Sequence, residues 1–211
     1  MQKIVIFDMD GTLIDSKKDM TISINYVRKK NHQLPPLPES FVVDAINQHE
    51  RNLAKLFYGR EVYEQRDREL FEKHYKEQCI ANSYLYEGVE DLLFALLDEG
   101  FKLSVATNAP TLFATTMLQH LGVADCFDAI VGADKVAKPK PHPDMLAHIL
   151  GHYRYDANQD KGWMIGDNSK DIESAHNVGI EAIFAAWGFS AFGHHSVVAK
   201  DPKEVLSYVR C

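Results

Sequence analysis

Short apolar runs that end abruptly in polar or small residues recur along this chain, and helical patterns separate the later ones. The runs cover residues 4–6, 103–106, 129–131, 163–165 and 182–185. Runs of this length and composition are typical of strands that are buried on both faces of a parallel sheet. The amphipathic helix patterns cover residues 89–97, 112–121, 145–150 and 172–178. This alternation predicts βαβ units, and therefore an α/β fold with a doubly wound parallel sheet.

The segment between the first and second runs does not follow this alternation. It contains no convincing strand, and Met20, Ile24 and Val27 lie on one face of a helical pattern. About 70 helical residues are too many for a single crossover between neighbouring strands. We therefore expect a catalytic core formed by residues 1–15 and 85–211, with an inserted α-helical cap at 16–84.

Composition and charge limit the class of protein. The 211 residues are 45% hydrophobic and 25% charged, as in ordinary globular proteins, and the net charge of −7 argues against nucleic acid or an anionic membrane as partner. The three cysteines are scattered, which is typical of free thiols in a reducing compartment. No apolar run approaches the length of a membrane span. We expect a cytoplasmic protein that is a monomer or a homodimer.

Two carboxylates follow the first predicted strand. Asp8 and Asp10 lie at its carboxyl end, which is where open α/β sheets bind their ligands. One intervening residue points them in different directions, so that Asp8 can attack as a nucleophile while Asp10 transfers protons. Gly11 then turns the chain with its backbone close to whatever binds there. A D-x-D pair in a surface turn is the alternative.

The second strand is followed by Thr107 and Asn108, whose hydroxyl and amide are candidate donors to a phosphate. Both residue types also favour helix N-caps, so they could instead cap the helix expected after Pro110.

Alternating prolines in residues 137–143 predict an extended chain that can fix the root of a lysine. An ammonium group aimed at Asp8 would offset the repulsion between this carboxylate and a phosphate. We expect Lys138 to provide it and Lys140 to be solvated. An ordinary exposed charge is the alternative for either lysine.

A second pair of acidic residues follows the run at 163–165. Asp167 lies at the end of this predicted strand, and Asp171 lies one helical turn later on a similar face. Together with Asp8 they predict an all-oxygen site suited to Mg²⁺. Acidic residues also stabilise helix N-termini, so capping is the alternative.

Taken in order, these segments resemble the four signatures of the haloacid dehalogenase-like (HAD) hydrolases. The signatures are D-x-D-G-T, a Thr or Ser that closes the second strand, a Lys in a Lys-Pro loop, and G-D-x-x-x-D. The resemblance covers about 3–16 and 84–189 and implies a HAD-like Rossmannoid core that binds Mg²⁺. The roles that it implies are nucleophile and metal ligand for Asp8, acid/base and backbone-carbonyl ligand for Asp10, direct metal ligand for Asp167, phosphate contact for Thr107 and Lys138, and support of the metal site or lysine for Asp171.

The resemblance also narrows the reaction. The dehalogenase branch of the family lacks a carboxylate at the position of Asp10, and the phosphonate-cleaving branch typically has a small residue there. The helical insert is similar to that of the phosphoglycolate phosphatase-like subgroup. The resemblance therefore implies a Mg²⁺-dependent phosphatase that hydrolyses a small phosphomonoester through an aspartyl-phosphate, with 2-phosphoglycolate as the leading substrate.

Other functions are compatible with the same core. They are a sugar-phosphate phosphotransferase or mutase, a pyrophosphatase, a nucleotidase and a non-catalytic phosphate-binding protein. The subgroup often has a glycine-containing turn at the cap's helix junction, where this chain has residues 47–51. His49 and Arg51 in that junction are candidates to bind a substrate carboxylate, and a solvated junction is the alternative. Further candidate substrate-binding residues are Met9, Gly11 and Asn108.

Overall fold

The computed structural model describes residues 1–48, 52–190 and 197–210, and the chain in it divides into two compact units. The first unit is formed by Met1–Ile14 and Leu85–Cys211, and the second by Asp15–Tyr84. The second unit covers nearly the interval that the sequence analysis assigns to a helical cap. Its role as a cap stays a prediction.

The first unit is built on a six-stranded sheet in the order β5-β4-β1-β6-β7-β8, and every neighbouring pair in it is parallel. The strands of the sheet are β1 (Lys3–Phe7), β4 (Lys102–Thr107), β5 (Ala129–Gly132), β6 (Lys161–Gly166), β7 (Glu181–Ala185) and β8 (Val198–Ala199). The chain leaves β1 toward β4 and β5 on one side and returns to β6 on the other. This reversal of strand order is the point at which open α/β sheets bind ligands, at the carboxyl ends of the strands.

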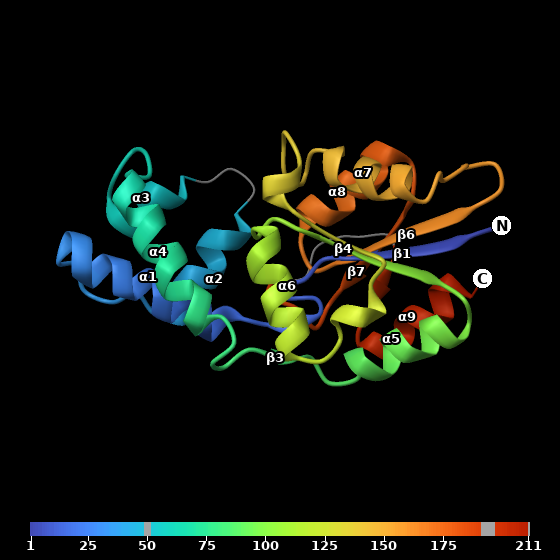
Figure 1. Ribbon diagram of the computed structural model, residues 1–211, viewed down its shortest axis with the longest axis horizontal. Helices are drawn as coiled ribbons and strands as arrows, with labels where there is room; N and C mark the ends of the chain where they lie inside the picture. Colours follow the sequence, from blue (N-terminus) through green and yellow to red (C-terminus); the bar gives the residue numbers. More distant parts are fainter. Residues whose placement is uncertain (49–51, 191–196, 211) are drawn as a thin grey trace. The chain divides into compact units, whose positions relative to one another are not determined.

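Helices cover both faces of this sheet. They are α5 (Val89–Asp98), α6 (Thr111–His120), α7 (Asp144–His152), α8 (Ser169–Val178) and α9 (Pro202–Val209), with short 3₁₀ helices η1 (Ala124–Cys126) and η2 (Ala133–Lys135). Figure 1 shows α7 and α8 on one face and α5 and α9 on the other. The predicted doubly wound parallel sheet is therefore confirmed.

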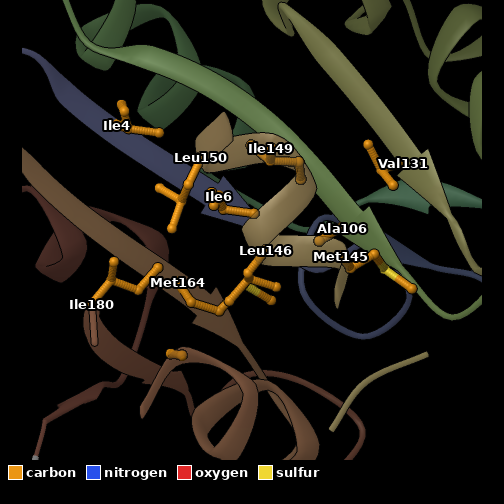
Figure 2. Packing of buried hydrophobic residues seen from close by; sticks show 11 residues of the cluster. Ile4, Ile6, Ala106, Val131, Met145, Leu146, Ile149, Leu150, Met164 and Ile180 are labelled. Carbon is orange, nitrogen blue, oxygen red and sulfur yellow. The ribbon is translucent and has the colours of Figure 1, made fainter. Parts of the chain in front are cut away.

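The core between α7 and the sheet shows why β1 is apolar from Ile4 to Phe7. Ile4 and Ile6 of β1 have no exposed surface and pack in one cluster with Leu146 and Ile149 of α7 and Met164 of β6 (Figure 2). Because side chains alternate along a strand, the other residues of β1 face the opposite helices. Each face of β1 is thus covered by helices, and the polar residues begin where the strand ends.

The second unit is helical, as the sequence predicts for residues 16–84. Its helices are α1 (Lys17–His32), α2 (Glu39–Asn47), α3 (Leu53–Tyr58) and α4 (Gln65–Gln78). Their apolar faces form a separate core that includes Ile24, Val27, Val42 and Phe57. The two-residue strands β2 (Ile14–Asp15) and β3 (Tyr84–Leu85) pair with each other where the chain passes between the units.

Buried polar groups tie the ends of this unit together. Asp19, in the first turn of α1, has no exposed surface. Its carboxylate accepts hydrogen bonds from the side chains of Gln78, Asn82 and Ser83 and from the backbone N–H of Asn82. A buried carboxylate needs such donors to offset its desolvation, so this network fixes where the chain leaves α4.

In the part of the chain that the structure describes, no helix combines the length and the apolar character required to span a membrane.

Candidate active site

The carboxyl edge of the sheet brings together four segments that are far apart in the sequence. Asp8 follows β1, Thr107 ends β4 and Asp167 follows β6. Phe7 pairs with Val105 of β4 and with Ile165 of β6, so the residues just beyond these three strands lie at the same level. The chain between β5 and α7 contributes the fourth segment. All four belong to the first unit.

The turn after β1 is held by its own backbone. The carbonyl of Met9 accepts hydrogen bonds from the N–H groups of Thr12, Leu13 and Ile14. Gly11 has φ of +88°, which favours glycine, and a Cβ at this position would overlap the carboxylate of Asp167. The glycine thus lets two segments of the site approach closely.

Three acidic residues converge at this edge. Asp8, Asp167 and Asp171 each offer a carboxylate oxygen, and these oxygens lie within 4.8 Å of one another. Burial raises the pKa of Asp167 well above its usual value, and the charges of Asp8 and Asp171 raise it further. Burial also raises the pKa of Asp171, which Lys140 opposes. Ionisation of all three carboxylates is therefore unfavourable in this place unless more positive charge is present.

Among the charged groups of this cluster, Asp8 is the most accessible. Its side chain is 12% exposed, whereas the side chains of Lys140 and Asp171 are each 2% exposed. A nucleophile has to be reached by its substrate, and a group that only supplies charge does not. The accessibility agrees with the role expected for Asp8.

Lys140, and not Lys138, is the lysine of the site, so the expectation that favoured Lys138 is wrong. The Nζ of Lys140 lies 2.8 Å from Asp8 Oδ1 and 2.5 Å from Asp171 Oδ1. Lys138 is exposed, and its backbone N–H donates to Asp144. Burial by itself lowers the pKa of Lys140, but the carboxylates of Asp171 and Asp8 outweigh that effect and raise it, so the side chain stays a charged ammonium.

Asp171 is both a helix cap and a partner of the lysine. Asn168 and Asp171 form a capping box at the start of α8, in which the N–H of Asn168 donates to Asp171 Oδ2 at 3.0 Å. The other oxygen accepts from Lys140. The capping alternative is therefore confirmed, and it leaves the predicted functional role open, since one carboxylate has two oxygens.

Asp167 is oriented by residues that the sequence analysis did not assign to the site. The hydroxyl of Thr12 donates to Oδ1 at 3.2 Å, and the N–H groups of Phe189 and Ser190 donate to Oδ2 at 2.7 and 3.3 Å. Trp187 Nε1 donates to the carbonyl of Thr12 at 2.9 Å. The segment after β7 therefore connects the turn after β1 to Asp167, and Gly188 in this segment was the available sequence signal.

Gly188 makes it possible to test whether the segment after β7 orients Asp167. A Cβ at position 188 would overlap the Asp167 side chain and the carbonyl oxygen of Gly11. In Gly188→Ala the segment has to shift, and we expect Mg²⁺ affinity to fall by about 10- to 100-fold because Asp167 loses its orienting donors. Calorimetric titration with Mg²⁺ measures this change.

The matched control is Gly151→Ala. A Cβ at this glycine of α7 meets nothing within 4 Å, so Mg²⁺ affinity should stay at the wild-type value. Equal Mg²⁺ affinity in Gly188→Ala and wild type would contradict the claim that the segment after β7 orients Asp167. Thermal unfolding checks that both variants fold.

Thr107 and Asn108 do not cap the helix that follows. The N-cap of α6 is Pro110, which has no capping side chain of its own, and the N–H of Thr111 at the start of the helix donates to Asp134 Oδ1 at 2.6 Å. Thr107 is 1% exposed and its Oγ1 accepts a hydrogen bond from the N–H of Ala109 at 3.1 Å, so its own O–H proton is available to donate. The side-chain amide of Asn108, which we expected to face a phosphate, bonds to the backbone of Lys140 instead.

The remaining predicted site residues are placed less specifically. Met9 has no exposed surface, and Asp10 is half-buried in a bridge with Ile14. His49 and Arg51 lie outside the described residues.

The donor set fits a hard divalent cation. The converging groups are carboxylates, and a magnesium or calcium ion prefers oxygen ligands. With the three carboxylates ionised, one ammonium leaves an excess of negative charge in a buried place. A cation would offset it, and a bound phosphate would then meet less repulsion from Asp8.

Comparison with known proteins places the chain in the family that its sequence motifs resemble. The sequence model of the family described as "Haloacid dehalogenase-like hydrolase" matches residues 5–185. The N-acetylmuramic acid 6-phosphate phosphatase of Pseudomonas aeruginosa is 30% identical over 213 residues, which are 97% of this chain and 93% of the relative. The phosphoglycolate phosphatase of Yersinia pseudotuberculosis is 32% identical over 211 residues, which are 97% of this chain and 88% of the relative.

A solved structure shows the likeness in fold. It is described as a predicted phosphoglycolate phosphatase from Haemophilus somnus and superposes with a TM-score of 0.82 at 24% identity. The alignment covers 98% of this chain and 97% of the other.

Proposed function

Because this chain belongs to the haloacid dehalogenase-like hydrolases, we propose that it hydrolyses a small phosphate monoester through an aspartyl-phosphate on Asp8, with Mg²⁺ as cofactor. Its relatives are named as phosphatases, and together with the family they support a phosphoric monoester hydrolase. The observation that carries the proposal is the cluster of Asp8, Asp167 and Asp171, with Lys140 bound to the first and last of them.

In the first step, an oxygen of Asp8 attacks the phosphorus of the ester. A bond forms between this oxygen and phosphorus, and the bond from phosphorus to the alcohol oxygen breaks. Asp10 donates its proton to the leaving oxygen. The Lys140 ammonium, 2.8 Å from Asp8, keeps its own proton and reduces the repulsion between carboxylate and phosphate.

In the second step, Asp10 takes a proton from water as the water oxygen attacks the same phosphorus. The bond between phosphorus and Asp8 breaks, inorganic phosphate leaves, and the Asp8 carboxylate is regenerated. Asp10 is protonated again and ready for the next ester. The hydroxyl of Thr107 is the proposed donor to the phosphate in both steps.

Asp8 and Asp167, with the backbone carbonyl of Asp10, would hold Mg²⁺, and Asp171 would support them through Lys140. When bound, the ion would neutralise charge between the carboxylates and the phosphate oxygens.

The substrate proposal rests on the names of the relatives. In both N-acetylmuramic acid 6-phosphate and phosphoglycolate, the phosphate is esterified to a hydroxyl group of a molecule that also carries a carboxylate. We therefore assign a carboxylate-bearing phosphomonoester, with 2-phosphoglycolate first and an acidic sugar 6-phosphate second. The second candidate is favoured by the 30% identity to the N-acetylmuramic acid 6-phosphate phosphatase. The roles of His49 and Arg51 at the carboxylate stay predictions.

A small substrate panel tests this function. It consists of 2-phosphoglycolate, N-acetylmuramic acid 6-phosphate, glucose 6-phosphate and p-nitrophenyl phosphate, each with Mg²⁺. We expect release of inorganic phosphate, with kcat/KM for one of the acidic esters about tenfold or more above that for glucose 6-phosphate. An isomerised sugar phosphate in place of free phosphate would indicate a mutase. Absence of turnover for every ester would contradict the proposal.

The proposal includes the partners and the location of the protein. A phosphate ester is the proposed small-molecule partner, and we expect no nucleic acid or membrane partner. A cytoplasmic location and a monomeric or homodimeric state also stay predictions.

A further inference from the structure

The side chain of Asn108 forms two hydrogen bonds with the backbone of Lys140. Its Oδ1 accepts a hydrogen bond from the Lys140 N–H at 3.0 Å, and its Nδ2 donates to the Lys140 carbonyl at 2.9 Å. A side-chain amide offers a donor and an acceptor side by side, so it can pair with both backbone groups of one residue as a neighbouring strand would. Asn108 follows β4, and its partner lies 32 residues later.

Lys140 needs such an anchor because its segment has no regular secondary structure. Residues 136–143 between η2 and α7 form neither helix nor strand. A lysine side chain has four rotatable bonds, and holding its ammonium in one place costs conformational entropy. The Nζ of Lys140 must nevertheless meet Asp8 and Asp171 at hydrogen-bond distance in a buried place. When the backbone of the lysine is fixed, its Cα is in place and only the side-chain bonds remain to be ordered.

The His142 N–H donates to the carbonyl of Pro139 at 3.0 Å and closes a turn over Lys140, but this bond does not use the N–H or the carbonyl of Lys140. The other side-chain contacts of this segment do not reach these two groups either. Asn177 Nδ2 donates to the carbonyl of Pro141 at 3.3 Å in an exposed position, and the N–H of Lys138 donates to Asp144. In the described part of the chain, the side-chain hydrogen bonds to the Lys140 backbone come from Asn108.

We propose that Asn108 is a positioning residue, which acts on the reaction by fixing Lys140 so that its ammonium is held against Asp8 and Asp171. The value of that ammonium to a bound phosphate rests on the proposed function. Because Asn108 directly follows Thr107, one short segment then places both the hydroxyl that donates to the phosphate and the lysine that neutralises the nucleophile.

A double-mutant cycle tests the proposal. The proteins are wild type, Asn108→Ala, Lys140→Met and the double variant. The readouts are the affinity for inorganic phosphate with Mg²⁺, measured by calorimetry, and kcat/KM for p-nitrophenyl phosphate. We expect Asn108→Ala to lower kcat/KM by about 10- to 100-fold, as misplacement of a catalytic group does. The double variant should have the same kcat/KM as Lys140→Met alone, because Asn108 cannot position an ammonium group that is absent.

Additive losses would overturn the proposal, since Asn108 would then act on the phosphate without Lys140. A wild-type value for Asn108→Ala would overturn it as well. Failure of the proposed function shows elsewhere in the cycle: wild type would neither bind phosphate nor turn over ester, or Lys140→Met alone would have no effect.

Controls separate positioning from general damage. Asn177→Ala makes the same chemical change and removes a hydrogen bond to the next residue of the segment, and we expect it to stay within about twofold of wild type. Thermal unfolding reports whether each variant folds. If Asn108→Ala does not fold, Asn108→Ser takes its place in the cycle, and the same criterion of masking by Lys140→Met applies.

Discussion

Asp8→Asn is expected to lose turnover while it keeps the ability to bind phosphate. The amide has nearly the volume of the carboxylate but is a poor nucleophile, so kcat should fall by about 10⁴-fold or more. At a Mg²⁺ concentration high enough to offset the loss of one metal ligand, phosphate affinity should be equal to or higher than that of wild type, because the negative charge that repels the phosphate is gone. Steady-state kinetics with p-nitrophenyl phosphate and calorimetry with inorganic phosphate measure the two effects.

The combination of these effects is what distinguishes a nucleophile from a binding residue. At saturating Mg²⁺, a residue that only binds the substrate would lose phosphate affinity together with rate. The matched control is Asp98→Asn at the exposed end of α5, which should behave as wild type. Retention of more than a few per cent of wild-type kcat in Asp8→Asn would argue against Asp8 as nucleophile.

Lys140→Met is expected to cause the second large loss. Removing the ammonium leaves Asp8 and Asp171 without their shared counter-charge, and the attack on a phosphate then meets greater repulsion. We expect kcat/KM to fall by about 10²- to 10³-fold, as when a charge-stabilising group is removed from an active site. The assay is the hydrolysis of p-nitrophenyl phosphate with saturating Mg²⁺.

Lys138→Met makes the same substitution two residues earlier and is the control. Because Lys138 is exposed and its backbone contacts Asp144, we expect it to stay within about twofold of wild type. A larger loss in Lys138→Met than in Lys140→Met would contradict the assignment of the site lysine.

The choice between these lysines shows where sequence reasoning ends. Residues two apart in an extended chain point to the same side, so the Lys-Pro-Lys-Pro pattern by itself does not rank Lys138 and Lys140. The hydrogen bonds from Asn108, which follows β4, distinguish Lys140 from Lys138. A tertiary contact of this kind has no signal in the local pattern.

The parallel sheet could be predicted because each of its five longer strands carries its own signal. Runs such as Ile4–Ile6 must be buried on both faces, and helix patterns of suitable length connect the later ones. The positions of Asp8, Thr107 and Asp167 then follow from the rule that such strands end at the same edge.

Shorter elements were missed for a physical reason. The strands β2, β3 and β8 have two residues each, which is too short for a periodic pattern. The helix α9 did carry a signal that we did not use: Asp201 is its N-cap and accepts from the N–H of Glu204, and Pro202 is its first residue. Similarly, the backbone N–H groups of Phe189 and Ser190 that orient Asp167 cannot be read from side-chain identity.

The central claim is that Asp8 carries the phosphoryl group during turnover, and trapping that species tests it most directly. In Asp10→Asn, p-nitrophenyl phosphate should still phosphorylate Asp8, since the leaving group departs as the p-nitrophenolate anion and needs no proton, but no carboxylate at position 10 then deprotonates the water. Acid quenching followed by peptide mass spectrometry should then find a phosphoryl group on Asp8, and none in the Asp8→Asn/Asp10→Asn double variant. A phosphoryl group on another residue, or release of p-nitrophenol with none on the protein, would contradict the account.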